Sequence, residues 1–392
     1  MSAPPRGTVA VAYGLSATGI LATPLVLPVL PDIARDLHVS TGAVGLVVAL
    51  ASLPGIVAAP LIGLFADRLG RRAVAVPCLV VFGIGGLASA FAPNFAALLA
   101  LRFLQGIGAA GLINLAVVIL GDHFDGPERA RMIGRNAVVL TLGLSIYPTI
   151  GGALGEQWGW RAVFAIYAAA FPFAVFVSFA LPRSRPITTG TVLDQVRDAR
   201  ASLRDRRVVA MAATGFAVFI LVFGVATTLP LHLDEEFRAG ALVRGAMLAL
   251  PAVGAAVVAL TMGRLVSRWG AWDLLPVGCA LIAVAYIGIP IAPVVALVAL
   301  PAIAYGLGEG LTIVPLQDYA ASLAPEQRGV MVAIWVSAVR GGQAVGPAVA
   351  GLAITGLGTS GAFVAGAGLA AMLAVATAAV RPGLKVRDAA AR

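Results

Sequence analysis

The sequence predicts an all-α membrane protein with twelve transmembrane helices in two pseudo-symmetric six-helix bundles. The 392-residue chain is 60% hydrophobic and only 11% charged, with a mean hydropathy of +0.97. Its apolar runs reach about 20 residues, long enough for a helix to cross a hydrocarbon layer roughly 30 Å thick, and they do not alternate as barrel strands do. A charged hairpin recurs 200 positions later in the chain, which indicates a duplicated half.

The first six apolar runs define the predicted N-terminal bundle, residues 1–181. Each run is bounded by charged residues or by proline, glycine or asparagine, which punctuate helices. Several gaps are so short that neighbouring spans must be antiparallel. We expect the spans near residues 8–31, 42–66, 73–92, 95–120, 132–154 and 161–181.

A polar segment, residues 182–207, separates the two bundles. Within it Thr191 could cap a helix, with Asp194 three residues later. The apolar residues on one face of that helix would be Val192, Val196, Ala199 and Leu203. An amphipathic cytoplasmic helix and a solvated tether both fit this pattern. The C-terminal bundle, residues 208–392, has its spans near 208–231, 242–265, 271–292, 294–319, 330–357 and 360–381.

Basic residues fall in alternate loops and predict the orientation in the membrane. Lysine and arginine favour the cytoplasmic side, and they concentrate in residues 182–207, in the C-terminal tail and in the loops after even-numbered spans. The opposite loops are uncharged or acidic, as at Asp234-Glu235-Glu236. We therefore expect both termini in the cytoplasm of a bacterial cell, in a multi-pass protein of its plasma (inner) membrane. The net charge of +9 is read as a topology signal, so no nucleic-acid partner is expected.

The chain carries no catalytic, metal-binding or nucleotide-binding signature. Cys78 and Cys279 lie in apolar runs, where they are expected to be small buried hydrophobes. His38, His123 and His232 lie at loops or span ends, where we expect solvated surface roles. The sequence therefore predicts that the protein is not an enzyme and needs no cofactor or metal.

The hairpin between spans 2 and 3 reads Gly63-Leu64-Phe65-Ala66-Asp67-Arg68-Leu69-Gly70-Arg71-Arg72. It resembles the loop between the second and third helices of the major facilitator superfamily, whose two halves rock around a midplane cavity. The resemblance implies a cytoplasmic gate, with Asp122 as the partner of Arg71. A basic loop without a gating role is the alternative. The implied gate residues are Gly63, Asp67, Arg68, Gly70, Arg71, Arg72 and Asp122.

Span 4 contains a charge, Arg102, within Leu101-Arg102-Phe103-Leu104-Gln105-Gly106. The segment resembles the span-4 motif of drug–proton antiporters, in which the arginine is coupled to proton transfer. An arginine inside a span costs about 2.5–3.5 kcal/mol on insertion scales, so something must compensate it. Asp32, at the end of span 1, is the best candidate partner. The alternative is an arginine that snorkels to the outer headgroups.

Spans 5 and 11 are rich in glycine and proline. Span 5 contains Gly143-Leu144-Ser145-Ile146-Tyr147-Pro148-Thr149-Ile150-Gly151-Gly152, which resembles the antiporter motif of the drug-exporting branch. Tyr147 departs from the motif, which has glycine there, and weakens the inference of strict antiport; span 11 keeps the glycine, in Gly346-Pro347. Because small residues permit close helix contact, span 5 is expected to pack against the other half. Ordinary helix packing is the alternative.

Two ionisable residues lie well inside the last spans, Glu309 in span 10 and Arg340 in span 11. Such residues are functional candidates by default, and a carboxyl group there could carry a proton. Arg340 could instead pair with Glu309 and be structural, since superfamily members often carry an arginine just before the Gly-Gln of span 11.

The cavity of this superfamily is lined chiefly by spans 1, 4, 7 and 10. Here those spans offer Tyr13, Thr23, Phe103, Gln105, Asn114, Phe216, Phe219, Phe223, Tyr305 and Glu309. An apolar, aromatic lining with one or two acids suits lipophilic molecules, cations among them. The sequence thus predicts a monomeric drug:H+ antiporter of the 12-span branch, with a small-molecule substrate, protons and the lipid bilayer as partners. A metabolite or nutrient carrier, working by symport or uniport, and a non-transporting membrane sensor are the alternatives.

Overall fold

The computed structural model describes residues 7–182, 202–269, 271–323 and 328–384. Within these ranges all regular structure is helical and there is no strand. The amphipathic helix expected after Thr191 lies outside the described residues, as do the basic residues of the C-terminal tail, Lys385, Arg387 and Arg392.

The described helices group into two compact units. The first unit holds residues 7–182 and 238–249, and the second holds residues 202–237 and 250–384, in the described parts of the chain. The sequence assigns residues 238–249 to the second bundle, whereas in the structure they group with the first unit. This short segment brings a buried arginine, described below, to the first unit.

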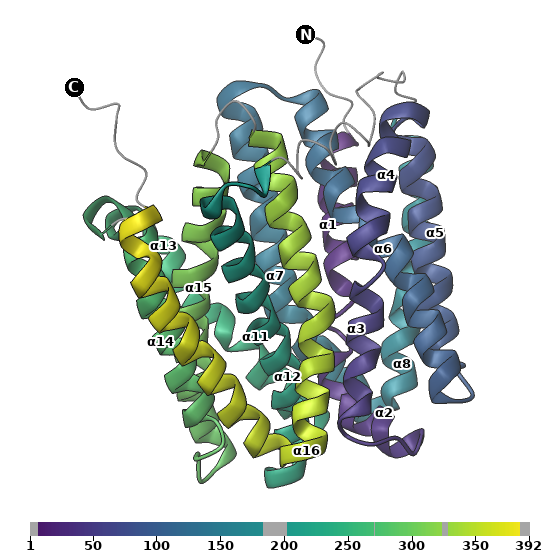
Figure 1. Ribbon diagram of the computed structural model, residues 1–392. Helices are drawn as coiled ribbons and strands as arrows, with labels where there is room; N and C mark the ends of the chain where they lie inside the picture. The colour runs from purple at the N-terminus through teal and green to yellow at the C-terminus, as the bar shows by residue number, and fades with distance from the viewer. Residues whose placement is uncertain (1–6, 183–201, 270, 324–327, 385–392) are drawn as a thin grey trace, which may run out of the picture. The chain divides into compact units, whose positions relative to one another are not determined.

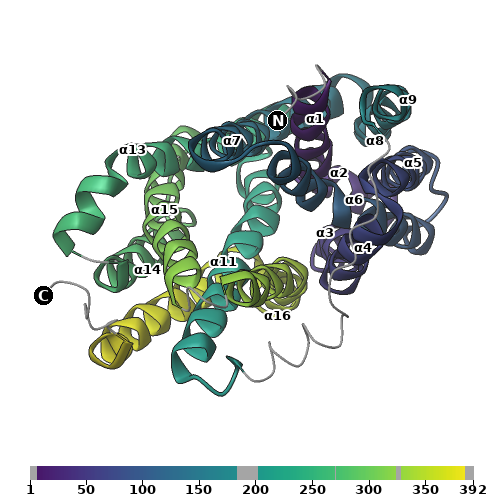
Figure 2. The same cartoon turned by 90° about the horizontal axis from the view of Figure 1, so that it is seen from above.

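The first unit consists of helices whose breaks follow proline and glycine (Figures 1 and 2). Pro24, Pro28 and Pro31 interrupt the first predicted span, because proline removes a backbone donor, and three short helices replace one long helix. The elements are α1 (Thr8–Leu21), η1 (Leu27–Val29), α2 (Leu30–Asp36), η2 (Ala43–Gly45), α3 (Leu46–Ser52), α4 (Gly55–Leu69), α5 (Arg71–Ser89), α6 (Phe95–His123), α7 (Gly126–Trp158), α8 (Trp160–Ala165), η3 (Ile166–Ala169), α9 (Ala170–Ala180) and α12 (Ala241–Ala249).

The second unit consists of α11 (Arg206–Phe237), α13 (Pro251–Trp269), α14 (Ala271–Gly288), η4 (Val295–Val298), α15 (Ala299–Ser322) and α16 (Arg328–Leu384). The long α16 is two helices joined at Gly358, whose φ of +73° is non-helical. Glycine adopts that conformation readily because it lacks a Cβ atom. Helices α11 and α16 lie side by side in both views (Figures 1 and 2).

Eight described helical stretches are long and apolar enough to cross a membrane, and a pair of helices bent by 50°, Ala43–Ala59 and Leu61–Leu69, forms a ninth. Two apolar helices are shorter, Thr8–Leu21 and Trp272–Gly288. The stretch Val330–Ala379 contains the break at Gly358 and therefore covers two predicted spans. Each of the twelve predicted spans thus has a helical counterpart among the described residues.

The internal repeat is visible in the packing, because equivalent glycines touch equivalent neighbours at a constant offset of 200 residues. A side chain at Gly106 in α6 would collide with the carbonyl oxygen of Ala51, and one at Gly306 in α15 with that of Pro251. Each unit therefore uses glycine to bring two helix backbones together. The next pair keeps the same offset, with Gly108 against Cys78 and Gly308 against Gly278.

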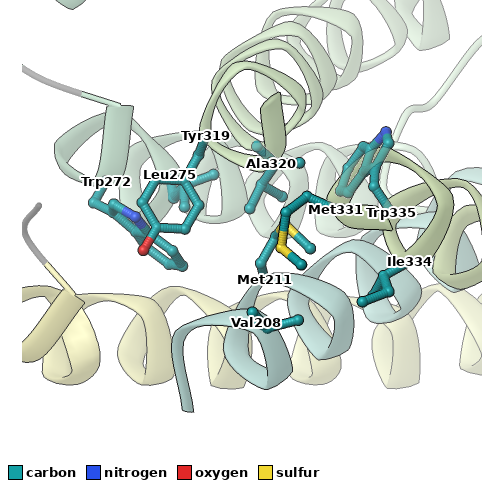
Figure 3. Packing of buried hydrophobic residues seen from close by; sticks show 10 residues of the cluster. Val208, Met211, Trp272, Leu275, Tyr319, Ala320, Met331, Ile334 and Trp335 are labelled. Carbon is teal, nitrogen blue, oxygen red and sulfur yellow. The ribbon is translucent and has the colours of Figure 1, made fainter. Parts of the chain in front are cut away.

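The second unit has a compact apolar cluster, which Figure 3 shows from close by. Side chains from α11, α14, α15 and α16 meet there, and the ring of Trp272 stands edge-on to that of Tyr319 with centroids 4.9 Å apart. Such aromatic pairs stabilise packing beyond their buried area. The cluster comprises Val208, Met211, Trp272, Leu275, Leu316, Tyr319, Ala320, Met331, Ile334 and Trp335.

Candidate functional site

The hairpin predicted as a gate joins α4 to α5 in the first unit. Gly70 ends α4 with a φ of +95°, a conformation that favours glycine. The turn sets Arg71 at the start of α5, where its Nε donates to Asp122 Oδ2 at 2.9 Å and its Nη1 donates to Asp67 Oδ1. The Arg71–Asp122 pair expected from the sequence is therefore present, and it links α5 to the C-terminal end of α6.

The remaining members of the hairpin differ in burial. Arg71 is only 7% exposed, whereas Arg68 is exposed and Arg72 is half-buried. A Cβ atom on Gly63 would meet no described atom within 4 Å, so close helix contact does not explain this glycine here. Arg71 is thus the centre of the cluster, with charge-assisted hydrogen bonds to two carboxylates.

Arg102 in α6 is fully enclosed by the first unit. Its side chain is 0% exposed, and its guanidinium carbon lies 5.7 Å from the centroid of the Phe164 ring. The guanidinium ties α6 to α3 and to the end of α1, so Arg102 does not snorkel outward. Its hydrogen bonds run from Nε to Val47 O at 3.1 Å, from Nη2 to Ala22 O at 2.8 Å and from Nη1 to Gln105 Oε1 at 2.5 Å.

Asp32, at the start of α2, has partners other than the predicted one. Its Oδ2 accepts a hydrogen bond from Arg244 Nη2 at 2.7 Å, and its Oδ1 accepts one from Arg35 at 2.5 Å. Arg244 belongs to α12 and is 2% exposed. The predicted pairing of Asp32 with Arg102 is therefore wrong, because carbonyl and amide oxygens satisfy Arg102 and a cation 212 positions away reaches Asp32.

Helix α12 is held on the glycine-rich face of α7, the predicted span 5. A side chain at Gly152 would collide with the carbonyl oxygen of Ala241, and one at Gly245 with that of Pro148. The Glu156 carboxylate also accepts a backbone N–H near the start of α12 at 2.8 Å. Because both helices carry glycine at the crossing, their backbones can approach closely enough to place Arg244 beside Asp32.

Helix α7 also packs against α1 and against the residues that follow α1. A Cβ atom on Gly143 would lie 2.7 Å from the Ile20 side chain, and one on Gly151 would collide with the carbonyl oxygen of Leu25. The Tyr147 hydroxyl donates to Ala17 O at 3.2 Å, across the α1–α7 contact. Tyrosine at this position thus adds a hydrogen bond where the resembled motif has glycine.

The glycines of α16 pack in the second unit against the phenylalanines of α11. Cβ atoms on Gly342 and Gly346 would lie 2.5 Å from Phe216 O and 2.7 Å from Ile220 O, respectively. Pro347 is buried in the same helix. The three phenylalanines predicted to line a cavity therefore pack at this crossing, namely Phe216, Phe219 and Phe223.

Glu309 lies in the interior of α15 and is half-buried. Among the described residues its carboxylate forms no hydrogen bond or ion pair, and the half-buried Arg340 guanidinium of α16 forms none either, so the two do not pair. One turn before Glu309, the Tyr305 hydroxyl is buried with no described hydrogen-bond partner. Unpaired polar groups inside an apolar bundle can hold a proton or a polar part of a ligand.

The other predicted cavity residues are dispersed. Gln105 is buried and accepts a hydrogen bond from Arg102, and the Tyr13 hydroxyl donates to Met132 O at 3.3 Å. Both residues therefore have structural partners. Phe103 is 41% exposed, while Thr23 and Asn114 are half-buried. A cavity of about 100 Å³ lies in the second unit between α11, α14 and α16, beside Tyr286 and Gly346. It is smaller than the roughly 300–1,000 Å³ usual for ligand sites.

The sequence profile described as Major Facilitator Superfamily matches residues 9–334. The chain belongs to that superfamily. It is 26% identical over 259 residues to the bacillibactin exporter of Bacillus subtilis, a match that covers 63% of this chain and 64% of that protein. It is 34% identical over 158 residues to the multidrug resistance protein Stp of Mycobacterium tuberculosis, covering 40% of this chain and 29% of that protein. The chain thus spans less than two thirds of the length of these curated relatives.

Solved structures of superfamily transporters share the fold. A bacterial homologue of the human lysosomal transporter Spinster, in an inward-facing and unoccupied conformation, aligns with a TM-score of 0.79 at 17% identity over 97% of this chain and 96% of that chain. The nucleoside transporter NupG aligns with a TM-score of 0.78 at 16% identity over 95% and 99%. The chain therefore has the fold of these transporters, and its apolar helices make it a multi-pass membrane protein, as the sequence predicts.

Sequence reasoning missed two residues of this superfamily member that the structure places in polar clusters. Arg244 lies inside a predicted span, so the energetic cost of a charge within the membrane, which drew attention to Arg102, would have indicated it as well. His232, expected at a solvated surface, is 1% exposed in α11. No residue pattern signalled its burial, because Thr359 and Phe363, which pack on its ring, come from α16, far along the chain.

Proposed function

We propose that this superfamily member is a proton-coupled exporter of small lipophilic compounds, cations among them, working by alternating access. The observation that carries the proposal is the unpaired carboxyl group of Glu309 in α15, next to the unsatisfied hydroxyl of Tyr305. A carboxyl group that exchanges a proton for a cationic substrate couples the two flows without another cofactor. The similarity to Stp, named a multidrug resistance protein, supports the export of several compounds.

The Arg71 cluster is proposed as the cytoplasmic gate. Arg71 holds Asp67 and Asp122 together at the α4–α5 turn, and the exposed Arg68 lies beside them in sequence. Each charge-assisted hydrogen bond contributes about 1.5–3 kcal/mol. A few such bonds are strong enough to hold a gate closed and weak enough to break when it opens. We also propose that both termini are cytoplasmic, that the host membrane is a bacterial inner membrane, and that the transporter is a monomer.

The proton-coupling proposal is tested in proteoliposomes with an imposed pH gradient. Ethidium, a lipophilic cation, is offered on one side, and an internal pH dye reports proton movement. Antiport predicts that ethidium transport dissipates the gradient, and that Glu309→Gln removes the proton flux. Glu128→Gln, at an exposed position in the first turn of α7, is the matched control.

The outcomes separate the alternatives. Ethidium transport that is insensitive to the gradient in wild-type protein would contradict proton coupling. No transport of ethidium or any anionic probe, with Glu309→Gln indistinguishable from wild type in every assay, would favour a non-transporting sensor. Symport would appear as proton movement in the same direction as the substrate.

A second candidate is a carrier of anionic metabolites, because Arg340 is a half-buried cation with no described partner. Citrate exporter 1 of Aspergillus niger is 29% identical over 175 residues, which cover 44% of this chain and 33% of that protein. This candidate predicts that citrate is transported and that Arg340→Gln abolishes its transport. The exporter of lipophilic cations predicts that ethidium transport survives the same substitution.

A further inference from the structure

The second unit contains a buried histidine relay away from Glu309. His232, near the end of α11, places its Nδ1 3.2 Å from the Thr359 hydroxyl, and that hydroxyl donates to Glu235 Oε2 at 2.7 Å. Thr359 follows Gly358, the non-helical residue of α16. The relay therefore connects the end of α11 to the turn between the last two predicted spans.

The direction of these hydrogen bonds fixes the position of the imidazole proton. A threonine hydroxyl has one hydrogen to donate, and an ionised carboxylate can only accept. Because Thr359 donates its hydrogen to Glu235, its oxygen can only accept from His232, so Nδ1 carries the proton of the neutral ring. The other nitrogen, Nε2, then holds a lone pair, and it is buried with no described hydrogen-bond partner.

The surroundings can balance a second proton on the ring. Burial disfavours a charged ring, whereas the carboxylates of Glu235, linked through the Thr359 hydroxyl, and of Glu236 on the same helix favour one. From α16 the ring meets Thr359 and Phe363, whose ring centroid lies 5.3 Å away, and α11 adds Phe237 at 6.2 Å. Tyr286 of α14 reaches Phe363 and donates its hydroxyl to the α11 backbone, so it offers His232 no charge.

We propose that His232 Nε2 is a proton-binding site of the second unit, with the Glu235–Thr359 relay holding the ring in the tautomer that accepts the proton. Histidine is the side chain whose ordinary pKa lies within the physiological range. In the predicted orientation, the acidic segment after His232 lies on the non-cytoplasmic side, from which protons would enter. Proton binding at His232 does not depend on Glu309 or on any transported substrate.

The test is nitrogen NMR of ¹⁵N-histidine protein in lipid nanodiscs. The chain has three histidines, so His38→Gln and His123→Gln assign the His232 signals. At pH 8 we expect His232 to carry its proton on Nδ1, and to gain a second proton on Nε2 as the pH is lowered. The same titration in Glu309→Gln should be unchanged, which separates this site from the proposed transport function.

Two substitutions in the relay sharpen the result. Thr359→Val removes the acceptor, and Glu235→Ala frees the threonine hydrogen to point at Nδ1, so each should abolish the preference for Nδ1–H. The matched control is Thr377→Val, a buried threonine of α16 that donates to Leu373 O in its own helix. A wild-type ring protonated on Nε2 at pH 8, or one that stays neutral down to the pH at which the protein unfolds, would overturn the proposal.

Discussion

Arg102 braces the first unit by linking α6 to α3 and to the end of α1, and its replacement by methionine tests that role. Methionine is unbranched and apolar but shorter than arginine, and it removes the three hydrogen bonds of the guanidinium. The carbonyl oxygens of Val47 and Ala22 and the Gln105 side-chain oxygen each lose a buried partner. Ala22 O keeps a second partner, the Tyr167 hydroxyl at 3.1 Å, and Val47 O lies inside α3, where the helix supplies one.

The expected loss follows from these contacts. Each of the two lost carbonyl bonds is worth about 0.5–1.5 kcal/mol and the unsatisfied Gln105 oxygen costs about 1–3 kcal/mol, so the Arg102→Met change should lower the free energy of unfolding by about 2–6 kcal/mol. For a unit of about 200 residues, each kcal/mol lowers the melting temperature by roughly 2–4 °C. The unfolding midpoint should therefore fall by on the order of 10 °C.

The assay is thermal unfolding of purified protein in detergent, followed by size-exclusion chromatography. Arg135→Met, at an exposed position of α7, is the control for loss of an arginine and should melt within about 2 °C of wild type. Arg102→Lys should fall between, because an ammonium group keeps the charge but lacks the planar fork that reaches three acceptors. If Arg102→Met melts with wild type while proton coupling is lost, the brace is refuted and a coupling role is supported.

Three further predictions concern the first unit. Gly151→Ala should lower the melting temperature by several degrees, because the added methyl group meets a backbone carbonyl oxygen and overpacking costs about 1–3 kcal/mol; an unchanged midpoint would show that α7 is not held this closely. Asp32→Asn and Arg244→Met should each lower the melting temperature. Because the two side chains form an ion pair, the double variant should lose less stability than the sum of the two single losses, as a double-mutant cycle measures. Additive losses would show that the pair does not contribute to stability. The hydrogen bond from Arg161 lowers the pKa of Asp36 below its usual 3.8, so its stabilisation is present above pH 4 and lost as the pH falls further. As the pair is exposed, Asp36→Asn should cost only about 0.5 kcal/mol at pH 7 in thermal unfolding, and a difference that grows on acidification would contradict the sign.

The constant offset of 200 residues extends the duplicated sequence motifs to tertiary contacts. The sequences immediately around Gly106 and Gly306 differ. Both glycines nevertheless face equivalent backbone atoms, in α3 and α13 respectively. Glycine is required there because any Cβ atom would strike a carbonyl oxygen. The buried arginine does not follow the repeat, since Ala302 stands where the first half has Arg102.

The sequence by itself determined the all-helical membrane fold, the positions of the twelve spans and the Arg71–Asp122 pair. Apolar length dictates which segments leave water, and the glycine and charges of the hairpin are local enough to be recognised in a short motif. The spans and the hairpin depend on a residue's near neighbours and on the membrane, both of which the chain order specifies. The Arg71–Asp122 pair joins residues 51 positions apart and is implied by the family resemblance.

Tertiary structure alone decided the partners of the buried polar groups. Arg102 is satisfied mainly by backbone carbonyl oxygens, which every residue has and which therefore leave no mark in the sequence. Asp32 meets Arg244 because two glycine-rich helix faces allow α12 to lie on α7, and His232 is enclosed because the Gly358 turn brings Thr359 to it. The cost of an unsatisfied buried polar group requires that some partner exist, but only the folded path of the backbone selects which one.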